Sequence, residues 1–391
     1  MKLRTHLLAA AAIVVALPAY AQDTIKIGNI VAASGFLKSV GETAITAFDI
    51  AVDEINAAGG VNGKPIELIR FDSGSDPRQA SVGARKLIQD DDVLAILGPF
   101  SSGESRVAMN DAERFKTLMI PTAASAPGLT EGRTYSWRLT EDEQKQFSRL
   151  LTALTASDIP HKTAEIVYVS DEVVANSAGT QLYPALLKEA GIETGEPIPV
   201  QYKSFDMSAQ VATIMQKNPD IVAVAGLPES ASKIIKELRR QGYEGRVIGS
   251  QIFADPNVTE LFGPEGDGTI VVAGFWKDRT PQAAAFNEEL LALLDEKGIH
   301  KLGAHHTDAQ AYDGVYLLKQ LMEATGITGD PEMVEEERAK LASAMEGVHF
   351  NGIVGDDICF AGHDAELPGY VIEIKDGQWT KFAEAAADKC E

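Results

Sequence analysis

Apolar and polar residues follow two different rhythms along the first part of the chain. Short, largely apolar runs predict buried strands at residues 24–33, 65–72, 93–98 and 118–121. The stretches between these runs repeat apolar residues at helical spacing, which predicts helices at residues 42–60, at 77–89 and from Ser102 onward. Strands of this kind that alternate with helices are typical of a parallel sheet covered on both faces.

The same pattern begins again in the second half of the chain. Apolar runs predict strands at residues 164–170, 197–202, 220–226 and 246–251. Amphipathic stretches predict helices at residues 178–191, 208–218 and 229–242. We therefore expect a second α/β domain of like architecture, joined to the first around "SWRLTEDE" at residues 136–143. The helical stretch at residues 306–326 is expected to return to the first domain, because few strands remain to build a third.

The first 21 residues have the pattern of a secretory signal peptide rather than of a folded element. Two basic residues precede an apolar run at residues 7–17, and small residues stand at Ala19 and Ala21. That run is too short for a permanent membrane span, and no later segment is long and apolar enough to be one. We expect an exported, periplasmic protein that begins near Gln22 and carries no lipid anchor.

The charge balance excludes two classes of partner. The chain has 57 acidic and 35 basic residues, for a formal net charge of −22. Such a surface repels nucleic acids and anionic membranes, and we attribute the charge itself to solubility. The only cysteines are Cys359 and Cys390. In an oxidising compartment they are expected to form a disulfide that fastens the C-terminal tail, although two unpaired thiols remain the alternative.

Three stretches are expected at the carboxyl edge of the sheets, where parallel α/β folds gather their ligands. They are residues 98–105 ("GPFSSGES"), 120–129 ("IPTAASAPGL") and 249–256 ("GSQIFADP"). Ser102 at a helix start offers a hydroxyl beside free N–H groups, which suits a carboxylate, although a plain N-cap is the alternative. The small residues Ala123, Ala124 and Ser125 let a ligand lie against the main chain. The alternative is a tight turn that binds nothing.

Several of these stretches also resemble a known family. "IKIGNIVAASG", the block "AFDIAVDEINAAGGVNGKPIELIRFDSGSDPRQA", "ILGPFSSGES" and "IPTAASAPGLT" are similar to leucine/isoleucine/valine-binding periplasmic proteins, as is the later "YDGVYLL". The resemblance implies two doubly wound lobes joined by a three-stranded hinge, with solute bound between them and delivered to an ABC permease. It implies a first lobe of residues 22–140 plus 275–365, and a second of residues 141–274 plus 366–391.

The resemblance also implies roles for individual residues. Ser102, Ala123 and Ser125 match positions where the family holds a substrate carboxylate, and Ser125 with the Ala123 carbonyl also helps to hold an α-ammonium. In the second lobe, Asn176 and Leu227 stand where the family often has aromatic residues.

The acid that usually neutralises the ammonium is replaced here by Gln251. An ammonium in a closed site needs a counter-charge, because an unpaired buried charge costs several kcal/mol or more. Either another acid serves, with Glu229, Asp171 and Asp255 as candidates, or the solute has no ammonium. An aromatic carboxylate, a short amide or urea would be a solute without an ammonium.

Four aromatic residues are expected near the edges of the site, where they form either an apolar wall or part of the core: Phe36, Phe100, Phe253 and Trp276. "GPFSSGES" lacks the spacing of a nucleophile elbow. The adjacent His305 and His306 should diverge on a helix and lack the spacing of a zinc pair. We therefore expect a monomeric solute-binding protein of an ABC importer, with no catalysis, cofactor or metal. The alternatives are a sensory receptor of the same fold and an exported hydrolase that uses Ser102.

Overall fold

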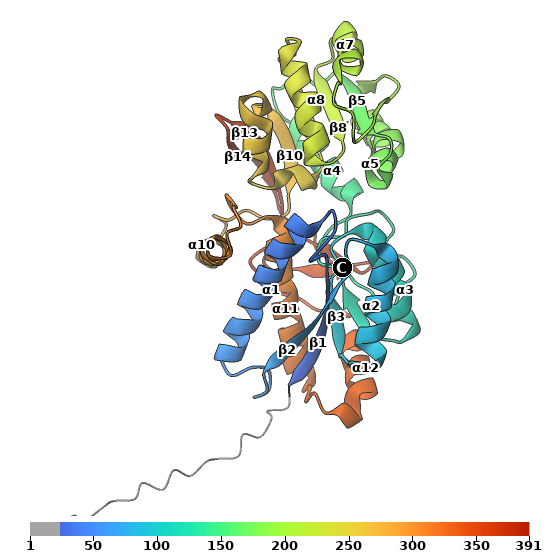
Figure 1. Cartoon of the computed structure of the whole chain (residues 1–391). Helices are drawn as coiled ribbons and strands as arrows, with labels where there is room; N and C mark the ends of the chain where they lie inside the picture. Colours follow the sequence, from blue (N-terminus) through green and yellow to red (C-terminus); the bar gives the residue numbers. More distant parts are fainter. Residues whose placement is uncertain (1–23, 391) are drawn as a thin grey trace, which may run out of the picture.

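Two α/β lobes stand one above the other in a computed structural model that describes residues 24–390 (Figure 1). The expected signal peptide, residues 1–21, lies outside that range. Within residues 24–390, no helix has both the length and the apolar character that a membrane crossing requires.

The first lobe contains the four strands predicted from the apolar runs. They form one parallel sheet in the order β2-β1-β3-β4. These strands are β1 (Ile25–Val31), β2 (Ile66–Asp72), β3 (Ala95–Leu97) and β4 (Leu118–Ile120). The main helices of this lobe are α1 (Lys38–Ala57), α2 (Pro77–Gln89), α3 (Ser102–Arg114), α10 (Pro281–Glu296), α11 (His306–Thr325) and α12 (Val334–Ala344). The turn η4 (Pro331–Met333) and the hairpin β11 (Cys359–Ala361) and β12 (Asp364–Glu366) complete it.

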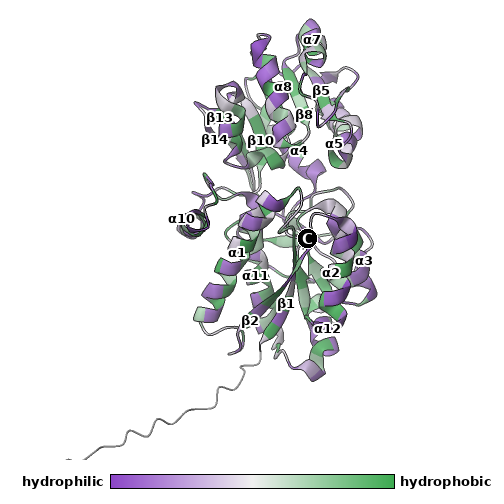
Figure 2. Ribbon diagram, in the orientation of Figure 1, coloured by the Kyte–Doolittle hydropathy of each residue, from purple (hydrophilic) through white to green (hydrophobic). Residues whose placement is uncertain are grey.

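The two faces of this sheet have separate cores. Ile27 of β1 packs in a core with residues of α1, α10 and α11, whereas Ile30 packs in a second core with residues of α2 and α3. Successive strand residues point to opposite faces, so a strand covered on both sides must be apolar at nearly every position. Figure 2 shows this as hydrophobic strands between helices whose outer faces are polar.

The second lobe is built on a larger sheet in the order β14-β13-β10-β9-β8-β5-β6, with β7 also paired to β5. Its strands are β5 (Thr163–Val169), β6 (Glu193–Thr194), β7 (Ile198–Val200), β8 (Ile221–Ala225), β9 (Arg246–Gly249), β10 (Thr269–Ala273), β13 (Gly369–Lys375) and β14 (Gln378–Ala385). Its helices are α4 (Glu143–Thr155), α5 (Val173–Ser177), η1 (Ala178–Leu182), α6 (Tyr183–Glu189), α7 (Ser208–Lys217), α8 (Pro228–Arg240), η2 (Gln251–Ala254), α9 (Val258–Phe262) and η3 (Gly263–Gly266).

The second lobe differs from the sequence prediction in several strands and in one helix. The short strand β6 and the buried strand β10 were not predicted. The edge hairpin β13–β14 is antiparallel and was also not predicted; β14 has no fully buried residue and so no apolar run, whereas β13 is buried. Its two-residue turn is Asp376-Gly377, both with positive φ, which is a turn typical of hairpins. The helix expected at residues 178–191 begins earlier, at Val173, and widens at η1, where the Tyr183 amide donates to the carbonyl five residues back.

Three chain segments connect the lobes, at residues 140–143, 274–280 and 366–369. They surround a cavity of about 10 Å³, whose lining includes Glu141, Arg149, Gln251 and Gln310. This volume has room for a single water molecule. The segments therefore form a narrow, polar hinge.

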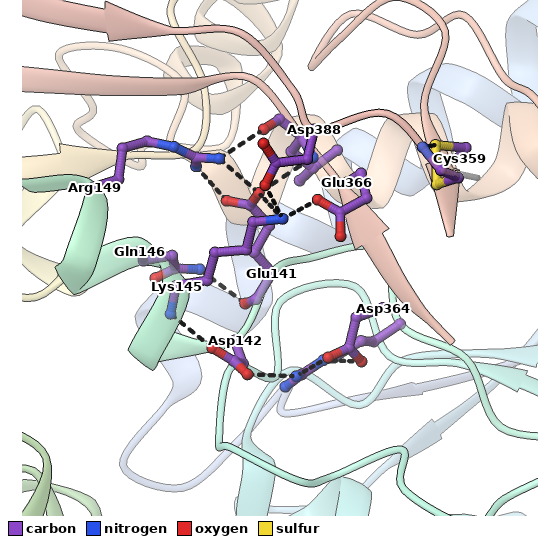
Figure 3. A network of polar contacts seen from close by, with 12 residues as sticks. Glu141, Asp142, Lys145, Gln146, Arg149, Cys359, Asp364, Glu366 and Asp388 are labelled. Atoms are coloured by element: carbon purple, nitrogen blue, oxygen red, sulfur yellow. Dashed lines mark hydrogen bonds and ion pairs between the residues drawn. A yellow bond between two sulfur atoms is a disulfide. The ribbon is translucent and has the colours of Figure 1, made fainter. Parts of the chain in front are cut away.

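Ion pairs and a disulfide connect segments at the hinge (Figure 3). Lys145 of α4 pairs with Glu366 and Asp388, and Arg149 pairs with Glu141. Cys359 of β11 is disulfide-bonded to Cys390. Because β14 belongs to the second sheet and β11 packs on the first lobe, this bond returns the C-terminal tail across the hinge.

Candidate functional site

The ends of β3 and β4 bring two of the predicted site segments together. The strands are neighbours in a parallel sheet, so their carboxyl ends meet at one edge. Gly98 ends β3 with a φ of +84°, and a Cβ there would lie 2.2 Å from the carbonyl oxygen of Ile30. Glycine is therefore required for the chain to turn at this point into α3.

The start of α3 differs from the prediction in one residue. Ser101, not Ser102, is the N-cap, and its hydroxyl accepts a hydrogen bond from the Glu104 amide. Ser102 is the first helical residue, and its hydroxyl accepts from the Ala126 amide at 3.1 Å. The interpretation of Ser102 as a plain N-cap is therefore wrong. Its side chain instead joins the helix start to the neighbouring loop.

Free amide groups remain at this helix start. Among the described residues, the N–H groups of Ser102 and Gly103 have no acceptor. Unpaired amides in the first turn of a helix carry a partial positive charge and are a common binding site for anions. The helix start can therefore accept a carboxylate.

The loop at residues 121–127 is held from behind by Arg138. This side chain is fully buried, and its Nη1 donates to the carbonyls of Ala124 at 3.0 Å and Ala126 at 2.8 Å. Its Nε donates to Asp364 at 2.6 Å. Because the C=O and N–H of one peptide unit point in opposite directions, the Ala124 carbonyl on Arg138 turns the Ser125 amide away from it. That amide has no acceptor among residues 24–390.

The predicted residues of this loop are thus placed beside Ser102. Ala123 and Ala124 are buried and Ser125 is half-buried. The amides of Ala123 and Ala124 also have no acceptor within the described range. Arg138 was quoted in the connecting segment but not assigned to the site, because nothing in the sequence indicates which carbonyls its side chain reaches.

The four aromatic candidates separate into two groups. Phe253 is fully buried in the second-lobe core, where its ring meets that of Phe262 edge to face, so of the two alternatives it belongs to the core. Trp276 also packs on that core. In contrast, Phe100 is half-buried beside Ser101, and Phe36 in the loop after β1 is 74% exposed.

Two of the predicted second-lobe residues follow neighbouring strands. Asn176 lies on α5 after β5, and its Nδ2 donates to the Ser170 carbonyl at 3.0 Å. Leu227 is the half-buried N-cap residue of α8 after β8, and its carbonyl accepts from the Ser230 amide. Both residues therefore lie at the carboxyl edge of the second sheet.

Gln251 has a different environment. It is 6% exposed, its Nε2 has no hydrogen-bond partner among the described residues, and it lines the hinge cavity. A Cβ on Gly274, in a connecting segment, would lie 2.4 Å from that Nε2. The structure thus places the Gln251 side chain against the hinge.

The three acids proposed to replace a missing counter-charge also differ in environment. Asp255 already pairs with Lys301 at 2.6 Å, so its charge is compensated. The Asp171 carboxylate accepts from the Tyr202 amide at 2.8 Å. Glu229 is exposed in the first turn of α8.

A fourth acid was missed by the sequence analysis. Glu143, the first residue of α4, is 7% exposed, and its amide donates to the Ser125 carbonyl at 2.8 Å. Burial, together with the nearby Glu172 and Asp142 carboxylates, raises the pKa of its carboxyl to about 7. The acidic run "EDE" before an apolar helix was the available signal, but it is equally typical of a solvated helix start.

Two arrangements bear on catalysis and metal binding. His305 is the N-cap of α11 with extended backbone, so its ring lies 3.8 Å from that of His306, and the expectation that they diverge is wrong. Burial lowers the pKa of His305 to about 3, with a further contribution from Lys301. Within residues 24–390, no histidine or carboxylate forms a hydrogen bond with the Ser102 hydroxyl.

Comparison with known proteins places the chain in a family. The family model described as "Periplasmic binding protein" matches residues 24–378. The Leu/Ile/Val-binding protein of Escherichia coli (strain K12) is 26% identical over 275 residues, which cover 67% of this chain and 71% of that protein.

Two solved structures share the fold. A branched-chain amino acid transporter substrate-binding protein of Streptococcus pneumoniae, in complex with isoleucine, has a TM-score of 0.78 at 22% identity and covers 94% of this chain and 100% of its own. An ABC transporter solute-binding protein of Rhodopseudomonas palustris, in complex with 3,4-dihydroxy benzoic acid, has a TM-score of 0.79 at 22% identity and covers 94% and 99%.

Proposed function

Because the chain belongs to the periplasmic binding protein family, of the type that includes the Leu/Ile/Val-binding proteins, we propose that it captures a small carboxylate-bearing solute for an ABC importer. Proteins of this family bind substrates for transporters and are not enzymes. In this proposal the protein works in the periplasm as a monomer, after removal of residues 1–21, and delivers its solute to the membrane subunits of a permease.

One observation carries the choice of a carboxylate. The free amides of the α3 start and of residues 123–125 lie at the ends of adjacent strands, and the Ser102–Ala126 hydrogen bond links the two segments. Several N–H groups around one point suit a carboxylate, since hydrogen bonds to charged groups contribute about 1.5–3 kcal/mol each. The named ligands of the two solved relatives, isoleucine and 3,4-dihydroxy benzoic acid, both carry this group.

The second lobe completes the site by closing over the solute. Asn176 and Leu227 stand at the carboxyl edge of the second sheet, and three connecting segments allow one lobe to rotate against the other. In this proposal the first lobe binds the carboxylate in the open form, and closure then brings second-lobe side chains onto the rest of the solute. Selectivity is set by those second-lobe side chains.

A thermal-shift panel tests the proposal. The probes are aliphatic amino acids, aromatic carboxylates, short amides and urea, each measured with wild type and with Ser102→Ala. A solute at a hundredfold excess over its Kd stabilises the folded state by about 2.7 kcal/mol, which is a readily measured rise in Tm. We expect stabilisation by one or more carboxylates that is weakened in Ser102→Ala. Stabilisation by amides or urea but by no carboxylate would refute the proposal.

A further inference from the structure

We infer that Glu143 is the counter-charge for an ammonium group on the bound solute, and hence that the solute is an amino acid or a similar ammonium carboxylate. This inference rests on the proposed function and identifies its substrate class. It assigns to Glu143 the role that the sequence comparison left vacant at Gln251.

The position of Glu143 relative to the carboxylate site carries the first step. Its amide donates to the Ser125 carbonyl, so the start of α4 adjoins the loop whose free amides are proposed to bind the carboxylate. Helical side chains lean toward the N-terminus of their helix, which directs the Glu143 side chain toward that loop. An amino acid held by its carboxylate at residues 123–125 would therefore present its ammonium near Glu143.

Segments of the second lobe meet at the same point. Glu172, which interacts with the Glu143 carboxyl, caps α5, the helix that carries Asn176. Tyr183 of α6 also interacts with Glu143. Glu143 therefore lies between the loop that carries Ser125 in the first lobe and the helix that carries Asn176 in the second.

The Tyr183 hydroxyl is a second, independent indication of a polar ligand. Its ring stacks on that of Phe147 at 4.0 Å, and Phe147 lies one helical turn after Glu143 on the same face of α4. The hydroxyl is fully buried and makes no hydrogen bond of normal geometry within the described residues, although Ser250 lies nearby. A buried polar group without a partner costs about 1–3 kcal/mol, and a bound ammonium beside Glu143 would bring polar hydrogens to this place.

Neighbouring acids around the hinge are compensated, whereas Glu143 is not. Glu141 pairs with Arg149, Glu366 with Lys145, Asp255 with Lys301 and Asp364 with Arg138. The charged groups that act on Glu143 are Glu172 and Asp142, both acidic, and its carboxylate has no ion pair among residues 24–390. A buried carboxylate without a cation is costly unless a ligand supplies one.

This environment predicts a pH dependence of binding. The groups that face Glu143 are Glu172 from the α5 start, Asp142 from its own helix start and the Tyr183 hydroxyl from α6. With a pKa of about 7, the carboxyl is partly protonated in the free protein and must lose its proton to bind an ammonium. Affinity for an ammonium solute should therefore rise as the pH rises through this value and level off above it.

Paired ligands measured by calorimetry provide the test. L-leucine and L-phenylalanine are compared with isocaproate and hydrocinnamate, which lack only the ammonium, in wild type, Glu143→Gln and Glu229→Gln. In wild type we expect one amino acid of these pairs to bind on the order of 100-fold more tightly than its des-amino partner, since truncating one side of a buried charge pair has this size. Glu143→Gln should remove most of that difference, and Glu229→Gln, which changes an exposed acid in the same lobe, should leave it.

The outcomes are distinguishable. If the des-amino carboxylates bind wild type as tightly as the amino acids, or if only Glu229→Gln abolishes the preference, the inference about Glu143 is wrong while the proposed function stands. If none of a broader set of carboxylates binds, the proposed function itself fails. A lowered melting temperature of Glu143→Gln would reveal a folding defect, and loss of the pH dependence in a folded Glu143→Gln supports the inference.

Discussion

The two sides of the candidate site differ in how completely their polar groups are paired within the protein. On the first lobe, the Ser101 cap, the Ser102–Ala126 hydrogen bond and the Arg138 guanidinium hold the helix start and the loop that are proposed to bind a carboxylate. On the second lobe, Glu143 is buried without a cation and the Tyr183 hydroxyl has no partner of normal geometry among the described residues.

We infer from this difference that the first lobe supplies affinity and the second lobe supplies selectivity. A preassembled anion site costs little ordering when the solute arrives, so it supplies affinity for any carboxylate that fits. A side with uncompensated polar groups gains most when the right solute closes it, so it supplies selectivity. Two acids illustrate this difference. Asp364 pairs with Arg138, whereas Glu143 has no basic partner among the described residues.

The largest effect should come from removing the Arg138 side chain, which holds the loop at residues 121–127 in the first lobe. Arg138→Met leaves the Asp364 carboxylate and two loop carbonyls without their partner, and breaking a buried pair in this way costs about 3–5 kcal/mol. The free energy of unfolding in urea measures the loss. Arg149→Met is the matched control, because Arg149 pairs with Glu141 but does not contact the loop. Carboxylate affinity should fall more in Arg138→Met than in Arg149→Met. An equal loss of affinity in both variants would contradict the role of Arg138 in holding the loop.

The next effect is a pH-dependent stability that belongs to the second lobe. Burial raises the pKa of Glu143 to about 7 in the folded protein from an ordinary value of 4.5. The folded state therefore binds more protons than the unfolded state between these values, and stability falls as the pH rises through this window. Glu143→Gln removes the cost of ionising this buried carboxyl. At a pH above the folded-state pKa, and with no solute added, its free energy of unfolding should therefore exceed that of wild type by up to about 3 kcal/mol.

Urea unfolding of both proteins across this pH range measures that difference. At a pH below the ordinary value of the carboxyl, the two proteins should be nearly equal in stability. A difference that stays constant at every pH would show that the substitution acts through packing instead of through charge.

A smaller effect should separate the two serines at the start of α3. Ser102→Ala removes the hydroxyl that binds the Ala126 amide, and we expect it to weaken carboxylate binding about tenfold, which corresponds to ~1.4 kcal/mol. Ser101→Ala removes the helix cap and should lower stability by about 1 kcal/mol with less effect on binding. Calorimetry and urea unfolding of both variants test this, and the reverse assignment of the two losses would refute it.

The smallest effect should follow a change at Gln251. Because its side chain lines the hinge cavity, Gln251→Glu should not improve the binding of an amino acid, although it adds the acid that the family comparison expects. A marked gain in affinity for L-leucine over isocaproate in this variant would place Gln251, and not Glu143, at the ammonium.

Much of the fold followed from the hydrophobic pattern alone. Strands β1, β3 and β4 of the first sheet are buried at nearly every position, so their sequences are largely apolar runs that are readily recognised as strands. β14 escaped prediction because its side chains are exposed or half-buried. The early start of the helix at Val173 also escaped, because α5 has only five residues before the helix widens at η1.

The site divides in the same way. The structure brings Ser102 and the loop at residues 123–125 together as expected, because the ends of neighbouring parallel strands meet at one edge of the sheet. Arg138 and Glu143 were not found, because their roles depend on where the connecting segment places two side chains. Ser101 and Ser102 could not be told apart, because helix starts are uncertain by a residue or more from sequence.

The crystal structure of the protein with its tightest-binding solute tests the central claim most directly. We predict that the carboxylate of that solute lies within hydrogen-bonding distance, about 2.7–3.2 Å, of the Ser102 hydroxyl or amide and of the amides at residues 123–125. A carboxylate bound to side chains of the second lobe, with those amides still free, would contradict the claim.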